Sequence, residues 1–418
     1  MSAHTTGTAP APLPMSAASI TDAEVASVTA ALRSGCLSLG TRLREFERQI
    51  EAITGARHAV GVSSGTAGLH LAVIAAGIGP GDLAITTPFS FVASSNCLLY
   101  ERACPVFVDV DPVTGNIDAA LVMEAAADLR AGGAAADRWL PRPWRGRARP
   151  DGALKAILPV HAFGQPAEMD PLWETATLHG LAVIEDACEA IGAEYRSRRA
   201  GRLGDAGVFG FYPNKQVTTG EGGMIVTDRD DWAERFRSLR NQGRDVMDAW
   251  LQHERLGYNY RLDELSAALG VAQCARLDEL LAGRDRVAQW YFDRLADAHA
   301  VVCPAILPST TRMSWFAFVV RLEAGCDRSE VMAALAARGV PSRAYFSPIH
   351  LQPFYASRFD YRRGDFPVAE ALGDACLALP FSSAMTEAAV DRVCRELRAA
   401  VGSMAERSAI RAPAVRTA

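Results

Sequence analysis

The stretch that decides the fold is residues 204–227, GDAGVFGFYPNKQVTTGEGGMIVT. Two apolar runs within it, at 207–211 and 224–226, have the length and composition of buried strands. Lys215 stands between them, in front of Gly220-Glu221-Gly222-Gly223. Desolvation in such an apolar segment favours a neutral amine, which is nucleophilic toward an aldehyde. An ordinary exposed lysine explains this motif about equally well when it is taken alone.

A second motif ends an apolar run in acidic residues: Val183-Ile184-Glu185-Asp186-Ala187-Cys188-Glu189. Ligands of wound α/β sheets bind beyond the carboxyl ends of the strands, so an acid at this place is well positioned for function. Asp186 there can face the nitrogen of a pyridine ring and hold it protonated, which makes the ring an electron sink. Capping of a following helix explains one such acid equally well.

Two further segments lie at predicted junctions near the same end of the sheet. Ser63-Ser64-Gly65-Thr66-Ala67-Gly68 follows a short strand and opens a helix, where backbone N–H groups and the helix dipole favour a phosphate group. Thr87-Pro88-Phe89-Ser90-Phe91-Val92 offers an aromatic side chain to a ligand. Taken singly, both motifs are weak, because small residues also serve tight packing and a Phe is more often part of the core.

Apolar runs of strand length recur along the first half of the chain, at 83–86, 105–108, 156–160 and 182–184. Helical patterns separate most of these runs. The first helical pattern covers residues 22–34 behind a Thr-Asp cap signal, and a second covers 41–53. This alternation predicts a wound, mainly parallel α/β sheet.

The last third of the chain has a different pattern. From about residue 276 a long helix leads to a strand at 315–322 and to helices at 328–338 and 386–400, which predicts a smaller α+β domain. The expected units are a disordered tail over 1–18, a large domain over 19–275, a small domain over 276–402 and a flexible tail over 403–418.

Residues 130–152 interrupt the pattern of the large domain. Gly and Ala are followed there by several Arg and Pro residues, a composition that suits neither helix nor strand. We therefore expect an inserted surface loop. It is either a solvated basic excursion or a flap over an anionic substrate.

Size and charge narrow the class of protein. With 418 residues the chain exceeds what one hydrophobic core usually supports, and its net charge of -5 gives no argument for nucleic-acid binding. The nine Cys are scattered singly, without zinc-binding spacing, and are typical of reduced residues in a cytoplasmic protein. We expect no signal peptide and no membrane span, because the first residues lack a basic start and no apolar run is long enough.

Together, over roughly residues 20–400, these motifs resemble the DegT/DnrJ/EryC1/StrS aminotransferases, the sugar-aminotransferase branch of fold-type I pyridoxal-phosphate enzymes. The resemblance implies an α/β fold with a mainly parallel wound sheet in a large domain and a smaller α+β C-terminal domain. The matching text comprises Ser64-Gly65-Thr66-Ala67, residues 88–93, Pro159-Val160-His161-Ala162-Phe163-Gly164-Gln165-Pro166, Glu185-Asp186-Ala187, Lys215 with residues 220–223, Gly257-Tyr258-Asn259-Tyr260-Arg261 and Pro348-Ile349-His350.

The resemblance also implies roles for single residues. Lys215 matches the Schiff-base lysine of the family, and Asp186 matches the acid that pairs with the pyridine nitrogen of the cofactor. Gly65 and Thr66 match the phosphate cradle, and Phe91 matches an aromatic residue that stacks on the cofactor ring. His161, Tyr212 and His350 are the candidates for substrate contacts.

Two positions depart from the common pattern of the family. Gly210 stands where a phosphate-binding Ser is usual, so another donor or a water has to replace that hydroxyl. Glu189 stands where Gln is more common, near the phenolic oxygen of the cofactor. An ionised carboxylate is repulsive at that place, so Glu189 is expected either to be protonated or to point toward the substrate.

Asn259 matches a segment that reaches the phosphate of the neighbouring subunit in this family, and Arg261 is a second candidate for that role. We therefore expect a homodimer with shared active sites. The alternative is that both residues only cap the following helix within their own subunit.

The function implied by the resemblance is transamination with pyridoxal 5'-phosphate, through its pyridoxamine 5'-phosphate form. The donor is an amino acid, Glu or Gln, and the acceptor is a keto sugar, which the Arg-rich segment suggests is linked to a nucleotide diphosphate. A keto-cyclitol or another ketone is the alternative acceptor. Some members of the family are sugar dehydratases with His in place of the lysine, and others are regulators. Lys215 argues against both.

Overall fold

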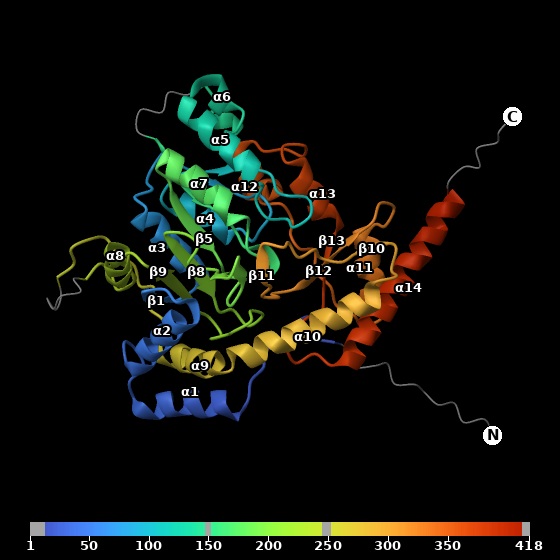
Figure 1. Cartoon of the computed structure of the whole chain (residues 1–418), viewed down its shortest axis with the longest axis horizontal. Coiled ribbons are helices and arrows are strands. Elements are labelled where there is room, and N and C mark those ends of the chain that lie inside the picture. Colours follow the sequence, from blue (N-terminus) through green and yellow to red (C-terminus); the bar gives the residue numbers. More distant parts are fainter. Residues whose placement is uncertain (1–12, 147–151, 245–251, 412–418) are drawn as a thin grey trace.

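The protein is described by a computed structural model that covers residues 13–146, 152–244 and 252–411, with side chains up to 402. Its largest element is a seven-stranded sheet with the strand order β1-β9-β8-β5-β4-β2-β3 (Figure 1). The strands are β1 (His58–Val62), β2 (Leu83–Thr86), β3 (Cys104–Phe107), β4 (Leu154–Leu158), β5 (Ala182–Asp186), β8 (Ala206–Gly210) and β9 (Gly223–Thr227).

The sheet is parallel except for one strand. β2 pairs in parallel with β3 and β4, and the parallel pairing continues through β5 to β8. Only β9 runs antiparallel to its two neighbours, β8 and β1. The predicted sheet is therefore confirmed, and the antiparallel pairing of β8 with β9 turns residues 211–222 into a loop at the carboxyl end of β8.

Helices cover both faces of the sheet, because successive strand residues point to opposite sides. Val208 and Ile225 pack against α3 and α8, whereas Phe209 and Met224 pack against α2 and α9. The helices of this region are α1 (Asp22–Ser34), α2 (Thr41–Thr54), α3 (Gly65–Ala75), α4 (Ala93–Tyr100), α5 (Ala119–Ala131), α7 (Met169–His179), α8 (Asp230–Arg240) and α9 (Glu264–Ala275).

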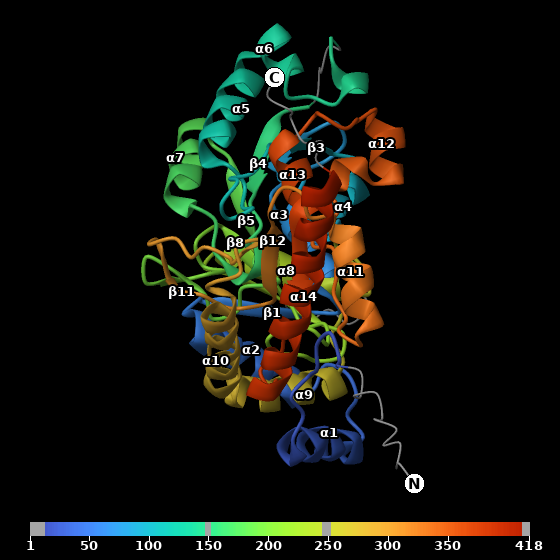
Figure 2. The same ribbon diagram turned by 90° about the vertical axis from the view of Figure 1, so that its right-hand side faces the viewer.

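Helix α10 (Leu277–Leu295) leads from the sheet region to a C-terminal region with its own core (Figure 1). Its sheet is antiparallel, in the order β10-β12-β13. Figure 2 shows α14 between α10 and α11, and both helices contact it. The elements are β10 (Val301–Val302), β12 (Phe318–Leu322), β13 (Cys376–Leu379), α11 (Arg328–Ala337), α12 (Pro353–Phe359), α13 (Pro367–Ala375) and α14 (Glu387–Arg411).

A third, small sheet joins the two regions. Its order is β11-β6-β7, with β11 (Thr310–Arg312) paired antiparallel to β6 (Glu194–Tyr195), and β7 (Arg198–Arg199) on the other side. The described elements also include three short helical turns: η1 (Arg142–Trp144), η2 (Ala162–Gly164) and η3 (Ile349–Leu351).

The prediction of a surface loop over residues 130–152 is wrong for much of the described part of that segment. Helix α5 continues to Ala131, α6 (Gly133–Asp137) follows, and a helical turn covers 142–144. The Gly-Gly-Ala-Ala-Ala text was misread because Ala is the strongest helix former, and the two Gly residues only separate the helices. Arg147 and Arg149 lie outside the described residues.

Both expected tails are shorter than predicted. Leu13 packs against the core of the C-terminal region, and the carbonyl oxygen of Met15 accepts a hydrogen bond from the Phe381 N–H at 3.0 Å. At the other end, α14 extends to Arg411 because its sequence contains no helix breaker after residue 402. Residues 1–12 and 412–418 lie outside the described residues.

Candidate active site

The main cavity lies beyond the carboxyl ends of the parallel strands and has a volume of about 700 Å³. We call it the strand-end cavity. Four strands of the sheet supply lining residues at or beyond their carboxyl ends: Ser64, Gly65 and Thr66 after β1, Phe91 in the segment after β2, Val160 after β4, and Asp186 at the end of β5. The cavity also contains Lys215 from the loop after β8. The topology of the sheet therefore brings together motifs that lie 150 residues apart in the sequence.

Lys215 projects into this cavity from the loop between β8 and β9. Its Nζ lies 3.3 Å from Oε1 of Glu189 and 4.0 Å from the centroid of the Phe316 ring, and its side chain is 15% exposed. Its backbone N–H donates to the Tyr212 carbonyl at 2.9 Å. The whole chain has only two lysines, Lys155 on β4 and Lys215, so no other lysine of the sequence is available to this cavity.

Asp186 is held in place by two hydrogen bonds. Its Oδ2 accepts from the Ser94 hydroxyl at 2.7 Å, and its Oδ1 accepts from the Cys188 N–H at 3.1 Å. Ser94 belongs to the first turn of α4, so that helix orients the carboxylate. Sequence reasoning did not single out Ser94, because a serine at a helix start has an ordinary explanation as a capping residue.

Glu189 is the second buried acid of the cavity. Its Oε2 accepts from the Phe163 N–H at 2.9 Å, while its Oε1 faces Lys215. Burial raises the pKa of Glu189 above the usual carboxyl value, and the charge of Lys215 opposes that shift. Burial also raises the pKa of Cys188 well above the usual thiol value, which keeps this neighbouring thiol protonated and a poor nucleophile.

The first turn of α3 forms a small, tight cradle at the floor of the cavity. Ser64 caps the helix by accepting the Ala67 N–H at 3.1 Å, so the N–H groups of the first turn point beyond the helix end. A Cβ atom on Gly65 would lie 2.7 Å from the Cys188 sulfur, whereas a Cβ on Gly210 would meet only ordinary contacts of 3.4 Å. Gly65 is therefore required by crowding, and Gly210 is not.

Aromatic side chains form two walls. Phe91 and Tyr212, both predicted from the sequence, line the cavity and are 64% and 54% exposed. Phe316, Tyr345 and Phe346 come from the C-terminal region, where Tyr345 and Phe346 stack with ring centroids 5.0 Å apart. Sequence reasoning missed these three residues. The usable signal was the aromatic pair Tyr345-Phe346, which Ser347 separates from Pro348-Ile349-His350.

His161 and His350 do not line the strand-end cavity, although both were predicted as substrate contacts. Each ring is fully buried and bonded to an acid through Nε2, His161 to Glu185 and His350 to Glu370, both at 2.9 Å. Glu185 in turn accepts the N–H groups of residues 201, 203 and 204. The two histidines therefore act as structural polar groups of the interior.

Asn259 and Arg261 also lie away from the strand-end cavity of their own chain. Asn259 is exposed, and Nη1 of Arg261 donates to the Asn241 side chain at 3.0 Å. The adjacent Tyr258 and Tyr260 stack on each other next to the buried ring of His70. The cap of α9 is Asp263, which accepts from the N–H groups of residues 265 and 266. Helix capping is therefore performed by a different residue.

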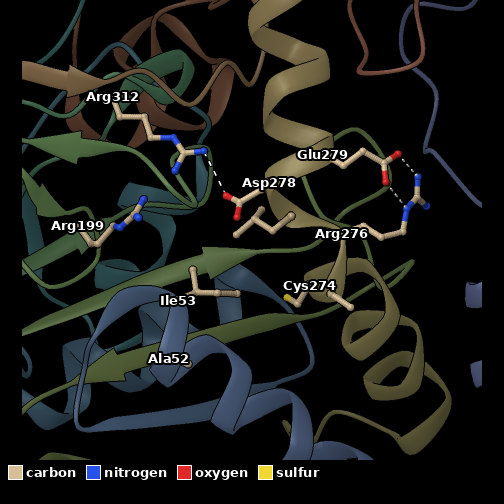
Figure 3. A pocket seen from close by; sticks show the side chains of 10 residues that line it. Ala52, Ile53, Arg199, Cys274, Arg276, Asp278, Glu279 and Arg312 are labelled. Carbon is tan, nitrogen blue, oxygen red and sulfur yellow. Dashed lines mark hydrogen bonds and ion pairs between the residues drawn. The ribbon is translucent and has the colours of Figure 1, made fainter.

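A second, smaller cavity of about 320 Å³ lies at the junction of α9 and α10 (Figure 3). We call it the corner cavity. Arg312 reaches across it to Asp278, with an Nη2–Oδ1 distance of 3.4 Å, and Arg199 points into it from the sheet side. Arg276 turns toward Glu279 at 2.7 Å. Arg276 also pairs with the buried Glu24 at 2.8 Å, whereas the Arg312–Asp278 pair is open to solvent at Asp278.

The residues of the strand-end cavity fit pyridoxal phosphate by their chemistry. An amine suits the aldehyde group, a hydrogen-bonded carboxylate suits the pyridine nitrogen, and the first turn of α3 suits the phosphate. Among the described residues there is no group of His, Cys, Asp and Glu side chains that could hold a metal ion.

Comparisons with known proteins agree with this geometry. The model of the DegT/DnrJ/EryC1/StrS aminotransferase family matches residues 18–398. A GDP-perosamine synthase from Caulobacter vibrioides is 41% identical over 362 residues, which are 86% of this chain and 90% of that protein. The spore coat polysaccharide biosynthesis protein SpsC from Bacillus subtilis is 35% identical over 400 residues, 92% of this chain and 96% of the relative.

A solved structure of DesV from S. venezuelae has a TM-score of 0.81 and 34% identity, and the match covers 93% of this chain and 98% of that one. An aminotransferase from Brucella abortus has a TM-score of 0.80 and 30% identity, over 90% of this chain and 95% of the other. The predicted fold class is confirmed by these likenesses. In the described parts of the chain, no helix is both long and apolar enough to cross a membrane.

Proposed function

Because the chain belongs to the DegT/DnrJ/EryC1/StrS aminotransferase family, whose members use pyridoxal phosphate, we propose that it binds this cofactor through Lys215. We also propose that it transfers an amino group from Glu or Gln to a nucleotide-linked keto sugar. One observation carries the proposal: Lys215, Asp186 and the first turn of α3 line one cavity. The names of the two curated relatives, a GDP-perosamine synthase and a polysaccharide biosynthesis protein, support a sugar as the acceptor.

Each residue has a defined task in the proposed reaction. The bound cofactor supplies an electron sink for the carbon that loses its proton. Lys215 takes the α-proton of the amino donor on its free amine and returns it to the cofactor carbon that carried the aldehyde group, so it acts as base and then as acid. The Asp186 carboxylate holds a proton on the pyridine nitrogen, and Ser94 keeps that carboxylate oriented. In this scheme Gly65 and Thr66 bind the phosphate, and Phe91 covers the ring.

A groove next to the strand-end cavity supports a nucleotide-linked acceptor. This side groove has a volume of about 430 Å³ and shares Val92 and Gln352 with the cavity. It carries two exposed aromatic rings, Tyr100 and Phe354, and the guanidinium of Arg358 lies 5.9 Å from the Phe354 ring. No ion pair of Arg358 is found among the described residues. Exposed rings and an uncompensated cation suit a base and its phosphates.

The Arg-rich segment does not support the nucleotide in the way the sequence suggested. Arg138 pairs with Asp128, and Arg142 forms two bonds to Asp365, so both charges are satisfied within the chain. Both line a separate cavity that shares no residue with the strand-end cavity. Arg358 is therefore the residue that we expect to bind a diphosphate.

A panel of acceptors tests this function directly. Protein carrying the amine form of the cofactor is mixed with nucleotide-linked keto sugars, free keto sugars and keto-cyclitols, and recovery of the aldehyde form is followed by absorbance. We expect recovery with a nucleotide-linked keto sugar, and a higher KM for that acceptor in Arg358→Met. The half-reaction with the amino donor is the internal control, because it does not involve the side groove. Recovery with keto-cyclitols alone contradicts the proposed acceptor.

We further propose a homodimer with shared sites, in which Asn259 and Arg261 reach the phosphate of the neighbouring subunit. The exposed position of Asn259 outside its own cavity supports this assignment. Mixing inactive Lys215→Ala subunits with Asn259→Ala subunits should restore activity, because one site of each mixed dimer has both residues intact. Complete subunit exchange without restored activity contradicts the shared site.

A further inference from the structure

Arg284 is a buried cation that faces backbone carbonyl groups instead of a carboxylate. It lies on α10 and is 3% exposed. Its Nη1 donates to the carbonyl oxygens of Trp315 at 2.9 Å and Phe316 at 3.1 Å. Its Nη2 donates to the carbonyl oxygens of Lys215 at 3.0 Å and Asn214 at 3.5 Å. One guanidinium therefore binds two segments that are a hundred residues apart in the sequence.

The charge of Arg284 has no acidic partner within the described residues. Burial lowers the pKa of its guanidinium to about 10, so the group stays charged near neutral pH. A buried charge without a counter-ion is costly unless dipoles compensate it, and the four carbonyl groups provide such dipoles. Loss of the guanidinium would leave these carbonyls without their donor.

The two segments held by Arg284 carry the amine of the strand-end cavity and the ring beneath it. Nζ of Lys215 lies 4.0 Å from the centroid of Phe316, and both residues offer their carbonyl oxygens to the same guanidinium. The planar fork of an arginine fixes the relative position of the groups it binds. Gln216 adds a second link, because its Nε2 donates to the Ser314 carbonyl at 3.0 Å.

We propose that Arg284 is a positioning residue for Lys215, which fixes the loop of the amine against the segment of Phe316. The inference rests on the proposed role of Lys215 as the group that moves the proton. A displacement of about 1 Å at a reacting group can lower a rate on the order of 100-fold. Arg284 thus controls turnover from a position outside the strand-end cavity, and it does so at the joint between the sheet region and the C-terminal region.

The test compares Arg284→Met and Arg284→Lys with Arg286→Met, a matched control two residues along the same helix that removes an exposed arginine. Full-length protein freed of cofactor is treated briefly with acetic anhydride, and acetylation is quantified by mass spectrometry. Because the chain has only Lys155 and Lys215, Lys155 is the internal reference. Thermal unfolding is recorded for each variant, and kcat and KM are measured on the cofactor-loaded protein.

We expect acetylation of Lys215 relative to Lys155 to rise several-fold in Arg284→Met, and kcat to fall on the order of 100-fold with little change in KM. Arg284→Lys keeps a cation that cannot span four carbonyls, so it should fold and show the same changes to a smaller extent. If the Met variant does not fold, the Lys variant decides. A folded Lys variant with unchanged kcat overturns the proposal, whatever its labelling ratio. Turnover by Lys215→Ala would contradict the proposed function and not the proposal for Arg284. The acetylation ratio of Lys215 to Lys155 tests the role of Arg284 without depending on the proposed function.

Discussion

The strand-end cavity and the corner cavity both contain charged side chains, but their surroundings differ. In the strand-end cavity the side chains of Lys215 and Glu189 are 15% and 9% exposed, and burial raises the pKa of Glu189. In the corner cavity Asp278, the partner of Arg312, is 93% exposed. The Lys215–Glu189 pair is thus enclosed, whereas the Arg312–Asp278 pair, which has a similar length, is open to water at Asp278.

This difference is the reason to expect chemistry at the enclosed Lys215–Glu189 pair and none at the exposed Arg312–Asp278 pair. Buried ionisable groups with shifted pKa values are concentrated at functional sites, because a protein tolerates their desolvation only where the surrounding structure compensates it. Exposed ion pairs contribute at most about 1 kcal/mol and are weakened by salt. Substitutions in the two cavities should therefore differ strongly in their effects on turnover.

The largest effect is expected for Lys215→Ala, which removes the proposed anchor of the cofactor and the group that moves the proton. Turnover should fall by about 10²- to 10⁴-fold or more, because general acid–base catalysis by one group contributes an effect of this order. Turnover is measured with the amino donor and the accepted keto sugar, and the fold is checked by circular dichroism.

Lys155→Ala is the matched control, since it removes the only other lysine of the chain. It should retain activity and the visible absorbance of a lysine-bound cofactor, which borohydride then abolishes. Near wild-type turnover in Lys215→Ala would show that the proposed mechanism is wrong.

A smaller but still large effect is expected for Asp186→Asn. The amide has nearly the same shape but cannot hold a proton on the pyridine nitrogen, so the rate should fall on the order of 100-fold while the cofactor still binds. Ser94→Ala removes only the hydrogen bond to Asp186, and about tenfold is expected there. Single-turnover absorbance measurements separate binding from chemistry. An equal loss in both variants would indicate that orientation matters and the charge does not.

Glu189→Gln should change the pH dependence of stability. The folded state raises the pKa of Glu189, so the folded protein binds more protons than the unfolded chain and loses stability as pH rises through this interval. Each unit of upward shift corresponds to about 1.4 kcal/mol. The Gln variant lacks this term and should gain Tm relative to the wild type from about pH 4.5 upward. A constant difference in Tm between pH 4 and pH 8 would contradict this prediction.

The sheet and the motifs that line the strand-end cavity could be predicted from the sequence because local signals determine them. The apolar runs before Asp186 and Lys215 identify strands, and parallel strands bring their carboxyl ends to one edge. The side chains that come from the C-terminal region could not be placed, because nothing local to Phe316 or Tyr345 states which cavity they face. Arg284 was missed for the same reason: one arginine on a helix is usually exposed.

The histidines show the opposite error. His161 and His350 lie in matching motifs and were expected at the substrate, yet each is fully buried against an acid. A histidine within a motif can serve packing as well as chemistry, and only the position of the ring distinguishes the two. The prediction of a loop over 130–152 was wrong for its Ala-rich start. It gave weight to the Gly, Arg and Pro content of the segment and too little to the high helix propensity of Ala.

The smallest effect is expected for Arg312→Ala in the corner cavity. The substitution removes one exposed partner of an ion pair that measures 3.4 Å and is open to solvent at Asp278. The free energy of unfolding should change by less than about 1 kcal/mol. The change should shrink further in 0.5 M salt, because the screening length falls from about 10 Å at 0.1 M salt to about 3 Å at 1 M and so approaches the separation of this exposed pair. Because no lining residue is shared with the strand-end cavity, kcat and KM should match those of the wild type. Arg199→Ala serves as the parallel variant from the other wall. A tenfold loss of kcat in either variant, with an unchanged Tm, would mean that the corner cavity is coupled to the reaction, and the distinction between the two cavities would then have to be abandoned.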